Sequence, residues 1–540
     1  MVAMRLSTCR WGARVRRRWC TRVRWPLGAF TLLLALAPGA ARAGAPAPGE
    51  LRVGVARVPA SLDPAAATTA DELMALRLVY QGLLTFGERG DLEPVLATGW
   101  SVSRDGLVWS FRVRPDVPLH DGTVLGTDDV VAALAERVSA EEPAETTPPW
   151  LRPFRGPGRI VREVRRGAGG SVEVVLAHPY APVLALLAHP GLGVAVARDP
   201  GRRVGSGPYR VQELRPGRLT LEVAPAWRGE PPASSRITLQ EMDDDATALA
   251  GLGPGGAVDV AVVRAPPGWA ALGLRVVAAT SWRVGLLAIR TDRGLTSRKP
   301  VRQAVALALD PSLVRAALGR WAVPHGGWLP PGAWAARDGA GLPFDPARAR
   351  RLLLPLGGID RTLTLLAGDQ PTGPEAGGLA EAIRASLDAV GFRTQVRIEP
   401  PETALAAVRQ GGAELALVES ALEVNDPDFF LRPLLAADGA VPGSASNVAF
   451  LRSSLVDGML LRAGQLGFRP ERLRLYARLQ TLLAEELPYV PVYARLQWLV
   501  ARPEVSGVRV EPSGWHRLET MRIDPSGGAS AGSSPDPGPR

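Results

Sequence analysis

The chain has 540 residues and a formal net charge of +10, and its length suggests roughly two to four domains. The charge is concentrated at one end, because residues 1–43 hold nine arginines and no acidic residue; without them the formal net charge is +1. The basic balance therefore gives no argument for nucleic-acid binding. Both cysteines, Cys9 and Cys20, lie in the same segment, which excludes a disulfide framework and a thiolate metal site in the remainder.

The first 43 residues have the layout of a cleavable signal peptide. Arginines precede an apolar run from Leu27 to Ala37, and Ala41-Arg42-Ala43 places small residues at a cleavage site. The apolar run is too short for a permanent membrane span, and no cysteine follows it as a lipid-attachment site. We expect export to a Gram-negative periplasm, by either the Sec or the twin-arginine route.

Strand and helix patterns begin directly after this segment. Residues 51–58 are expected to form a strand, and residues 71–84 place apolar side chains on one helical face. The turn at residues 103–106 precedes a strand over 107–113 whose apolar and polar residues alternate, which predicts a half-buried hairpin. His120 follows in a surface turn, and no nucleophile stands near it in the pattern, so we expect it to be structural.

The second half of the chain alternates strand-like and helix-like runs. Strands are expected over residues 363–367 and 394–398, on either side of a helix over 380–390. This alternation predicts an α/β layer. An aspartate N-cap followed by proline predicts three helix starts, at Asp310-Pro311, Asp345-Pro346 and Asp426-Pro427. Residues 526–540 are of low complexity and are expected to be disordered.

No catalytic or metal-binding motif has the context that its chemistry requires. Residues 251–256 match G-x-G-x-x-G, but they follow an alanine-rich helical stretch where a dinucleotide site needs a strand. Residues 243–245 are all aspartate without the spacing of a calcium loop, and the five histidines are scattered. Residues 204–208 contain a serine between two glycines, but a nucleophile elbow requires a glycine two positions before the serine, and Val204 stands there. We expect no cofactor, no metal and no enzymatic activity.

Segments along nearly all of the remaining chain resemble, in order, the large solute-binding proteins of ABC importers, the oligopeptide/dipeptide/nickel-binding family (family 5). The densest resemblance is LEPVLATGWSVSRDGLVWSFRVRPDVPLHDGTVLGTDDVVAAL at residues 92–134. Further segments are SLDPAAAT, YQGLLTF, GSGPYRV, VRQAVALALD, NDPDFFL and YARLQTLLAEELPYVPVYA. The length left after residue 43 also fits this family.

The resemblance implies an α/β fold of the periplasmic-binding-protein type (cluster C), with two α/β lobes joined by hinge strands and a smaller extra lobe. It implies a first lobe built from three segments, residues 44–88, 201–280 and 488–525. The small lobe would span residues 89–200, and the third lobe, residues 281–487, would close over the ligand by hinge motion. The hairpin and the turn at His120 would then be scaffold.

The implied function is that of a periplasmic solute-binding protein. It would capture a peptide or peptide-like solute and deliver it to an ABC permease and ATPase complex in the inner membrane, acting as a monomer and without catalysis. The same fold leaves other ligands open: a nickel complex, haem, glutathione or an oligosaccharide. A role as the ligand-presenting partner of a membrane sensor is also open.

In peptide-binding relatives, an acidic residue three positions before the Asp-Pro pair holds the α-amino group of the ligand. The resemblance gives this role to Glu423, since a carboxylate in a closed cleft would favour an ammonium group; the alternative is a solvated acid near a helix start. Asp426 is expected to be an N-cap.

Other residues are expected to line the cleft. The strand at 417–422 would run beside the ligand and contribute Glu419, Ser420 and Ala421; the first lobe would contribute Thr68, Thr69 and Ala70. Trp282 is a candidate pocket aromatic, with core burial as the alternative. Ser420 replaces a tryptophan common in peptide binders, and Gly377-Gly378 stand where dipeptide-selective relatives tend to have an arginine. A plain dipeptide is therefore disfavoured against a longer peptide, a cationic peptide or another solute.

Overall fold

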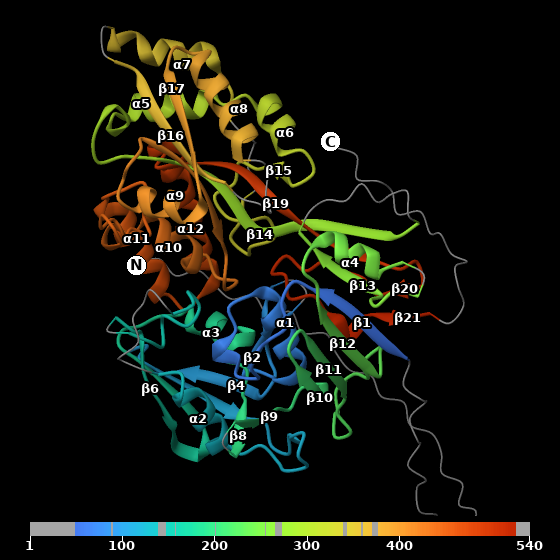
Figure 1. Cartoon of the computed structure of the whole chain (residues 1–540). Coiled ribbons are helices and arrows are strands. Elements are labelled where there is room, and N and C mark those ends of the chain that lie inside the picture. The colour runs from blue at the N-terminus through green and yellow to red at the C-terminus, as the bar shows by residue number, and fades with distance from the viewer. Residues whose placement is uncertain are drawn as a thin grey trace, which may run out of the picture. The chain divides into compact units, whose positions relative to one another are not determined.

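The computed structural model describes most of the chain after the expected signal peptide (Figure 1). The described residues are 49–87, 90–138, 147–156, 158–199, 201–253, 255–264, 273–337, 343–357, 360–369 and 376–524. The expected signal peptide and the tail at 526–540 lie outside them. No helix among these residues is both long and apolar enough to cross a membrane.

A mixed sheet of eleven strands runs through the molecule in the order β10-β11-β12-β1-β13-β19-β14-β18-β16-β17, with β15 beside β19 (Figure 1). The first group of strands is β10 (Tyr209–Arg215), β11 (Arg218–Val223), β12 (Arg236–Glu241), β1 (Glu50–Val55) and β13 (Val260–Val263). The last group is β18 (Leu415–Ala421), β16 (Thr362–Gly368), β17 (Arg393–Glu399) and β15 (Ala322–Pro324).

Two long antiparallel strands, β14 (Arg275–Ile289) and β19 (Tyr489–Ala501), join these two groups. Their pairing shifts register between Thr280 and Val284. The C-terminal residues of β19 pair with the first half of β14 on one side and with β13 on the other. The second half of β14 pairs with β18, and the middle of β19 pairs with β15. These two strands therefore connect the first group of strands with the last group.

Each group of strands has its own buried apolar core. The first group buries Leu51, Val53 and Leu239 against α1 (Ala70–Val79), and α4 (Asp245–Gly251) covers β13. The second group buries Leu365 and other apolar residues beneath its helices. These are α5 (Lys299–Ala308), α6 (Pro311–Leu318), α7 (Pro346–Leu353), α8 (Ala376–Asp388), α9 (Pro401–Arg409), α10 (Asp428–Leu435), α11 (Ser454–Gln465) and α12 (Arg469–Glu486).

A separate four-stranded antiparallel sheet has the order β4-β5-β7-β6, with β4 at Ala97–Val102, β5 at Val108–Val113, β7 at Val172–Leu176 and β6 at Val161–Arg166. It packs with α2 (Thr127–Ala135) and α3 (Val183–Leu186) around one core. The described residues also form three two-stranded antiparallel sheets: β2 (Leu84–Phe86) with β3 (Leu92–Pro94), β8 (Val196–Asp199) with β9 (Arg202–Val204), and β20 (Val505–Ser506) with β21 (Arg522–Ile523).

The predicted hairpin is confirmed as β4 and β5, with Trp109 opposite Val102 and both Trp109 and Phe111 buried. The predicted structural role of His120 agrees with its contacts, since its Nε2 lies 2.9 Å from the carbonyl oxygen of Gly207. Burial is the main cause of the lowered pKa of this imidazole. The residue fastens the surface turn to the segment that precedes β10.

The predicted helix starts were right at two of the three Asp-Pro pairs. Asp310 and Asp345 are N-caps, and each accepts a hydrogen bond of 2.8 Å from a backbone N–H in the first turn of its helix. The N-cap prediction for Asp426 was wrong, because α10 begins at Asp428 with Pro427 as its N-cap. The Asp426 carboxylate is instead held by a buried arginine, described below.

Candidate ligand-binding site

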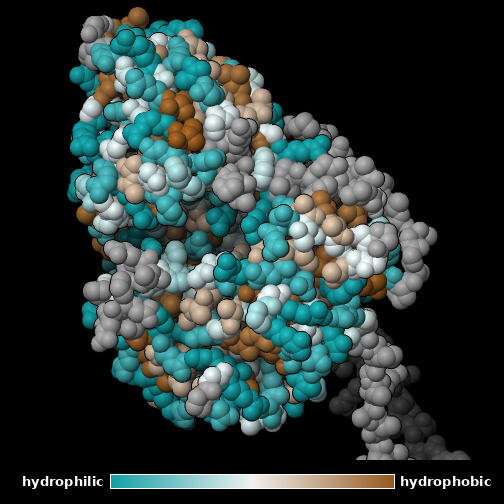
Figure 2. All heavy atoms as spheres, in the orientation of Figure 1, coloured by the Kyte–Doolittle hydropathy of each residue, from teal (hydrophilic) through white to brown (hydrophobic). Residues whose placement is uncertain are grey.

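Two pockets flank the long strands β14 and β19 where these pass between the two groups of strands, and Figure 2 shows a hollow in this face between the regions of α9–α12 and α1–α3. The arginine pocket, about 460 Å³, is lined by residues that include Arg57, Thr69, Ala70, Asp71, Arg264, Ser281, Arg283, Arg495 and Gln497. The tryptophan pocket, about 310 Å³, is lined by residues that include Arg77, Trp282, Asn425, Trp515 and Arg517.

The start of α1 forms one wall of the arginine pocket. Thr69 is the N-cap: its Oγ1 accepts a hydrogen bond from Glu72 N–H, and the Glu72 carboxylate accepts one from Thr69 N–H at 2.9 Å. This reciprocal pair fixes Thr69 and Ala70 at the pocket wall. Thr68 is exposed, also donates its backbone N–H to Glu72, and does not line the pocket.

Glu419 lies on β18 opposite Gly285 of β14, and Gly285 lies opposite Tyr493 of β19. A Cβ on Gly285 would overlap the ring of Tyr493, so glycine lets this ring cross the middle strand. Tyr493 Oη then donates a 3.4 Å hydrogen bond to Glu419, and burial is the main cause of the raised pKa of Tyr493.

The Glu419 carboxylate is neutralised by arginines. Its side chain is only 7% exposed, and its Oε1 accepts hydrogen bonds from Arg495 at 3.1 Å and from Arg283 at 3.4 Å. A buried carboxylate requires such partners. With both arginines in place, the three side chains together carry a net positive charge, which does not attract an ammonium group.

One edge of β18 is open beyond residue 417. The strand pairs with β14 through Leu415–Ala421 but with β16 only through Leu415–Leu417. The backbone N–H of Leu422 donates a hydrogen bond to the carbonyl oxygen of Trp282, so the backbone groups of Leu422 point toward β14. Because antiparallel strands alternate their hydrogen-bonding direction, the backbone groups of Glu419 and Ala421 point to the opposite edge. No other strand among the described residues pairs with that edge.

Ser420 and Ala421 are half-buried and lie opposite Val284 and Arg283 of β14. Neither side chain lines the arginine pocket or the tryptophan pocket. Their contribution to the site is therefore the strand backbone that they form.

Glu423 follows two residues after the end of β18 and is half-buried. Within the described residues, nothing donates a hydrogen bond to its carboxylate or forms an ion pair with it. Burial is the main cause of the lowered pKa of Arg152, and the charge of Glu423 opposes that shift, so the two groups interact electrostatically. Glu423 is thus unlike Glu419: it is an acid at the end of the open edge with no bonded partner.

Trp282 lines the tryptophan pocket and belongs to a series of aromatic rings. It meets Trp515 edge to face at 6.3 Å, Trp515 meets His189 at 4.9 Å, and His189 stacks on Trp150 at 4.6 Å. Asn425, which is 3% exposed, also lines this pocket. Trp515 and Asn425 were not predicted, because no local pattern separates a pocket aromatic or amide from a core one.

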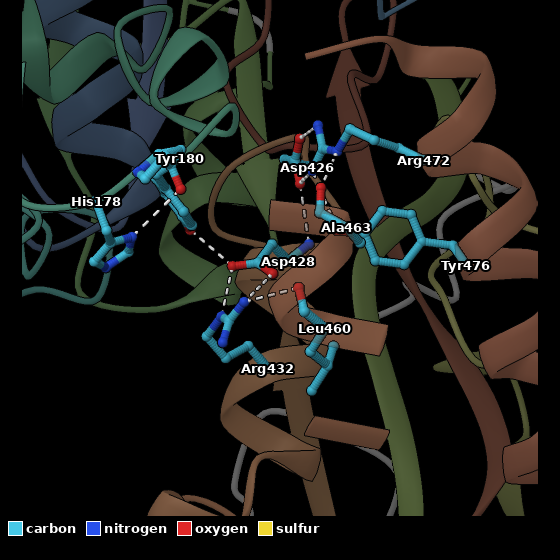
Figure 3. Close-up of polar contacts among 10 residues, drawn as sticks. His178, Tyr180, Asp426, Asp428, Arg432, Leu460, Ala463, Arg472 and Tyr476 are labelled. Carbon is cyan, nitrogen blue, oxygen red and sulfur yellow. Dashed lines mark hydrogen bonds and ion pairs between the residues drawn. The ribbon is translucent and has the colours of Figure 1, made fainter. Parts of the chain in front are cut away.

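A buried charged cluster supports the segment after Glu423 (Figure 3). Asp426 accepts two hydrogen bonds of 2.6 Å from Arg472 of α12, and its Oδ1 also accepts one from Asp428 N–H. Asp428 lies between Arg432 and Tyr180, whose Oη donates to it at 2.8 Å. Tyr180 follows β7, so this cluster connects the four-stranded sheet with α10 and α12.

Residues 91–441 match the family model described as bacterial extracellular solute-binding proteins, family 5, middle. The match covers well over half of the chain. The chain belongs to the family 5 solute-binding proteins. The predicted family is therefore confirmed, and members of this family bind solutes.

The chain is similar to curated proteins whose names refer to different ligands. It is 26% identical over 531 residues to the di/tripeptide-binding protein 2 of Pseudomonas aeruginosa, covering 91% of this chain and 98% of the relative. It is 24% identical to the haem-binding protein A of Haemophilus influenzae, covering 83% and 87% of the two chains. A glutathione-binding protein of Escherichia coli is 26% identical, with 86% and 91% covered.

Solved structures confirm the predicted fold class. HbpA2 from Haemophilus parasuis superposes on the family 5 protein with a TM-score of 0.77 at 19% identity, covering 88% of this chain and all of the other. The periplasmic binding protein DppA from Helicobacter pylori, in complex with the peptide STSA, superposes with a TM-score of 0.68 at 21% identity, covering 88% and 98%.

Proposed function

We propose that this protein binds a peptide or peptide-like solute in the periplasm and delivers it to an ABC permease and ATPase complex, with no catalysis of its own. The open edge of β18 is the observation that carries this proposal. An extended peptide can add to such an edge through main-chain hydrogen bonds, with the side chains around it giving specificity. Glu419 and Ala421 would contribute their backbone groups.

Glu423 would bind the α-amino group of the ligand. It lies at the end of the open edge, and its half-buried carboxylate has no hydrogen bond or ion pair among the described residues, whereas Glu419 is already paired with two arginines. An ammonium group would give Glu423 the charge-assisted hydrogen bonds that it lacks. Thr69, Ala70 and Trp282 would line the space around the ligand.

The protein would consist of three lobes. The first lobe would be formed by residues 44–88, 201–280 and 488–525, the small lobe by 89–200, and the third lobe by 281–487, with β14 and β19 as hinge strands. Ligand bridging the first and third lobes would favour a closed form that the permease recognises. Residues 1–43 would direct export, and the protein would act as a monomer.

The solute released from the protein tests this proposal. The full chain would be exported in a Gram-negative host, purified gently from the periplasm and denatured, and the released molecules identified by mass spectrometry. Short peptides would support the proposal. Haem, a metal chelate or a sugar would contradict the peptide assignment, and glutathione would support a peptide-like ligand.

A further inference from the structure

The segment that carries Glu423 is anchored in two different cores. Leu422 and Phe430 are buried in the core that β14 and β18 share with α10, α11 and α12. Val424, which lies between them in the chain, is fully buried and belongs instead to the core of the four-stranded sheet. Phe429 packs against the same core. The residue next to Glu423 is therefore held by a part of the molecule that is far from it in the chain.

Two hydrogen bonds join the four-stranded sheet to the same region. Tyr180, which follows β7, donates its Oη to the Asp428 carboxylate at 2.8 Å, and both side chains are buried (Figure 3). Burial raises the pKa of Tyr180 well above its ordinary value, so the phenol remains a donor at neutral pH. The backbone N–H of Ala181 donates to the carbonyl oxygen of Gly464, in the last turn of α11, at 2.7 Å. These bonds hold the segment around Glu423 in one position relative to the four-stranded sheet.

The surroundings of Glu423 itself come partly from the four-stranded sheet. The N–H of Asp426 donates to the carbonyl oxygen of Val424 at 2.6 Å, and this tight turn follows directly after Glu423. Arg152, which interacts electrostatically with Glu423, lies next to Leu151, a buried residue of the core of the four-stranded sheet. The position of the Glu423 carboxylate is thus defined from the side of the four-stranded sheet as well as from β18.

We infer that Val424 and Tyr180 are positioning residues for Glu423, and that their contacts across the two cores hold this carboxylate where the α-amino group of a ligand binds. This inference rests on the proposed function and gives the four-stranded sheet a role in amine recognition. A carboxylate binds an ammonium group through short, directional hydrogen bonds, which weaken when the support of the carboxylate loosens. Loss of these contacts should therefore reduce the affinity for a free amino group and leave the other contacts of the ligand unchanged.

Calorimetric titration of the purified full chain with trialanine and N-acetyl-trialanine tests this, because the ratio of the two affinities measures the preference for a free amino group. Val424→Ala removes two methyl groups next to Glu423 and should reduce this preference roughly 10-fold. Tyr180→Phe removes only the hydrogen bond to Asp428 and should reduce it several-fold. Val130→Ala, in α2 and equally buried in the same core, should leave the preference unchanged and is the matched control.

The outcomes separate this inference from the proposed function. A preference that is unchanged in both Val424→Ala and Tyr180→Phe would overturn the inference and leave peptide binding intact. An equal loss of preference in Val130→Ala would also overturn it, because the effect would then come from the stability of the whole core. Tyr180→Phe alone decides the matter if Val424→Ala does not fold. If the wild type bound neither trialanine nor tetra-alanine, the proposed function itself would fail.

Discussion

Nη1 of Arg495 lies 3.1 Å from Oε1 of Glu419, and this ion pair connects β19 with β18 across β14. The pair leaves Glu419 neutralised and Glu423 as the acid at the open edge with no bonded partner among the described residues. Two glutamates four residues apart thus have different roles. Glu419 positions arginines, and Glu423 is available to a ligand.

The position of Glu419 depends on the space at Gly285. Gly285→Ala should lower the free energy of unfolding by roughly 1–3 kcal/mol, because the added methyl group would overlap the Tyr493 ring and force it to move. Urea denaturation would measure the change.

Gly458→Ala in α11 is the matched control. No atom lies within 4 Å of the position that the added methyl group would take, so this change should stabilise the helix by roughly 0.5–1 kcal/mol. Equal effects of the two substitutions would contradict the packing described for Tyr493.

The buried pair of Asp426 and Arg472 should be costly to break. Asp426→Asn should lower the free energy of unfolding by roughly 3–5 kcal/mol, since it would leave a guanidinium that is 7% exposed without its counter-charge. Asp438→Asn, at an exposed position, should change stability by less than about 0.5 kcal/mol. A small effect of Asp426→Asn would show that water or another acid compensates Arg472.

Two buried histidines should make the fold sensitive to acid. Burial lowers the pKa of His516 to about 4 and that of His189 to about 3, below the ordinary value of 6.5. The unfolded chain therefore binds more protons between these values and about pH 6.5, so stability is full above pH 6.5 and falls as the pH drops toward 4.

His516→Asn should reduce this pH dependence while keeping an acceptor for the Glu511 N–H, which His516 Nδ1 binds at 3.1 Å. Denaturation midpoints at pH 7 and pH 4.5 would differ less in this variant than in the wild type. The control is His178→Asn, because His178 is exposed. An unchanged pH dependence in His516→Asn would contradict the role assigned to this imidazole.

Structural features that depend only on residues close together in the chain were predicted correctly from the sequence. The β4–β5 hairpin follows from a turn and alternating residues, and Asp310 and Asp345 find their N–H partners within the next three residues. Asp426 has the same Asp-Pro pattern, but its main partner is Arg472, 46 residues further on. A local pattern contains no information about such a partner.

The candidate site likewise combines features that are visible along the chain with features that depend on distant residues. Its strand and its two glutamates were identified from the sequence and the family resemblance. Which glutamate is neutralised depends on Arg283 and Arg495, brought together by pairing three strands that are far apart in the chain. The open edge of β18 also follows from sheet topology, since it exists because β16 pairs with only the first residues of β18.

The most direct test of the account is the affinity of Glu423→Gln for a peptide with a free amino group. Calorimetry should show that trialanine binds this variant more weakly than the wild type by roughly 2–5 kcal/mol, the range for a desolvated charge pair that loses one partner. Glu485→Gln, at an exposed position of α12, should bind like the wild type. N-acetyl-trialanine should bind wild type and Glu423→Gln equally weakly. Equal affinity of wild type and Glu423→Gln for trialanine, or equal affinity of the wild type for the free and acetylated peptides, would contradict the account.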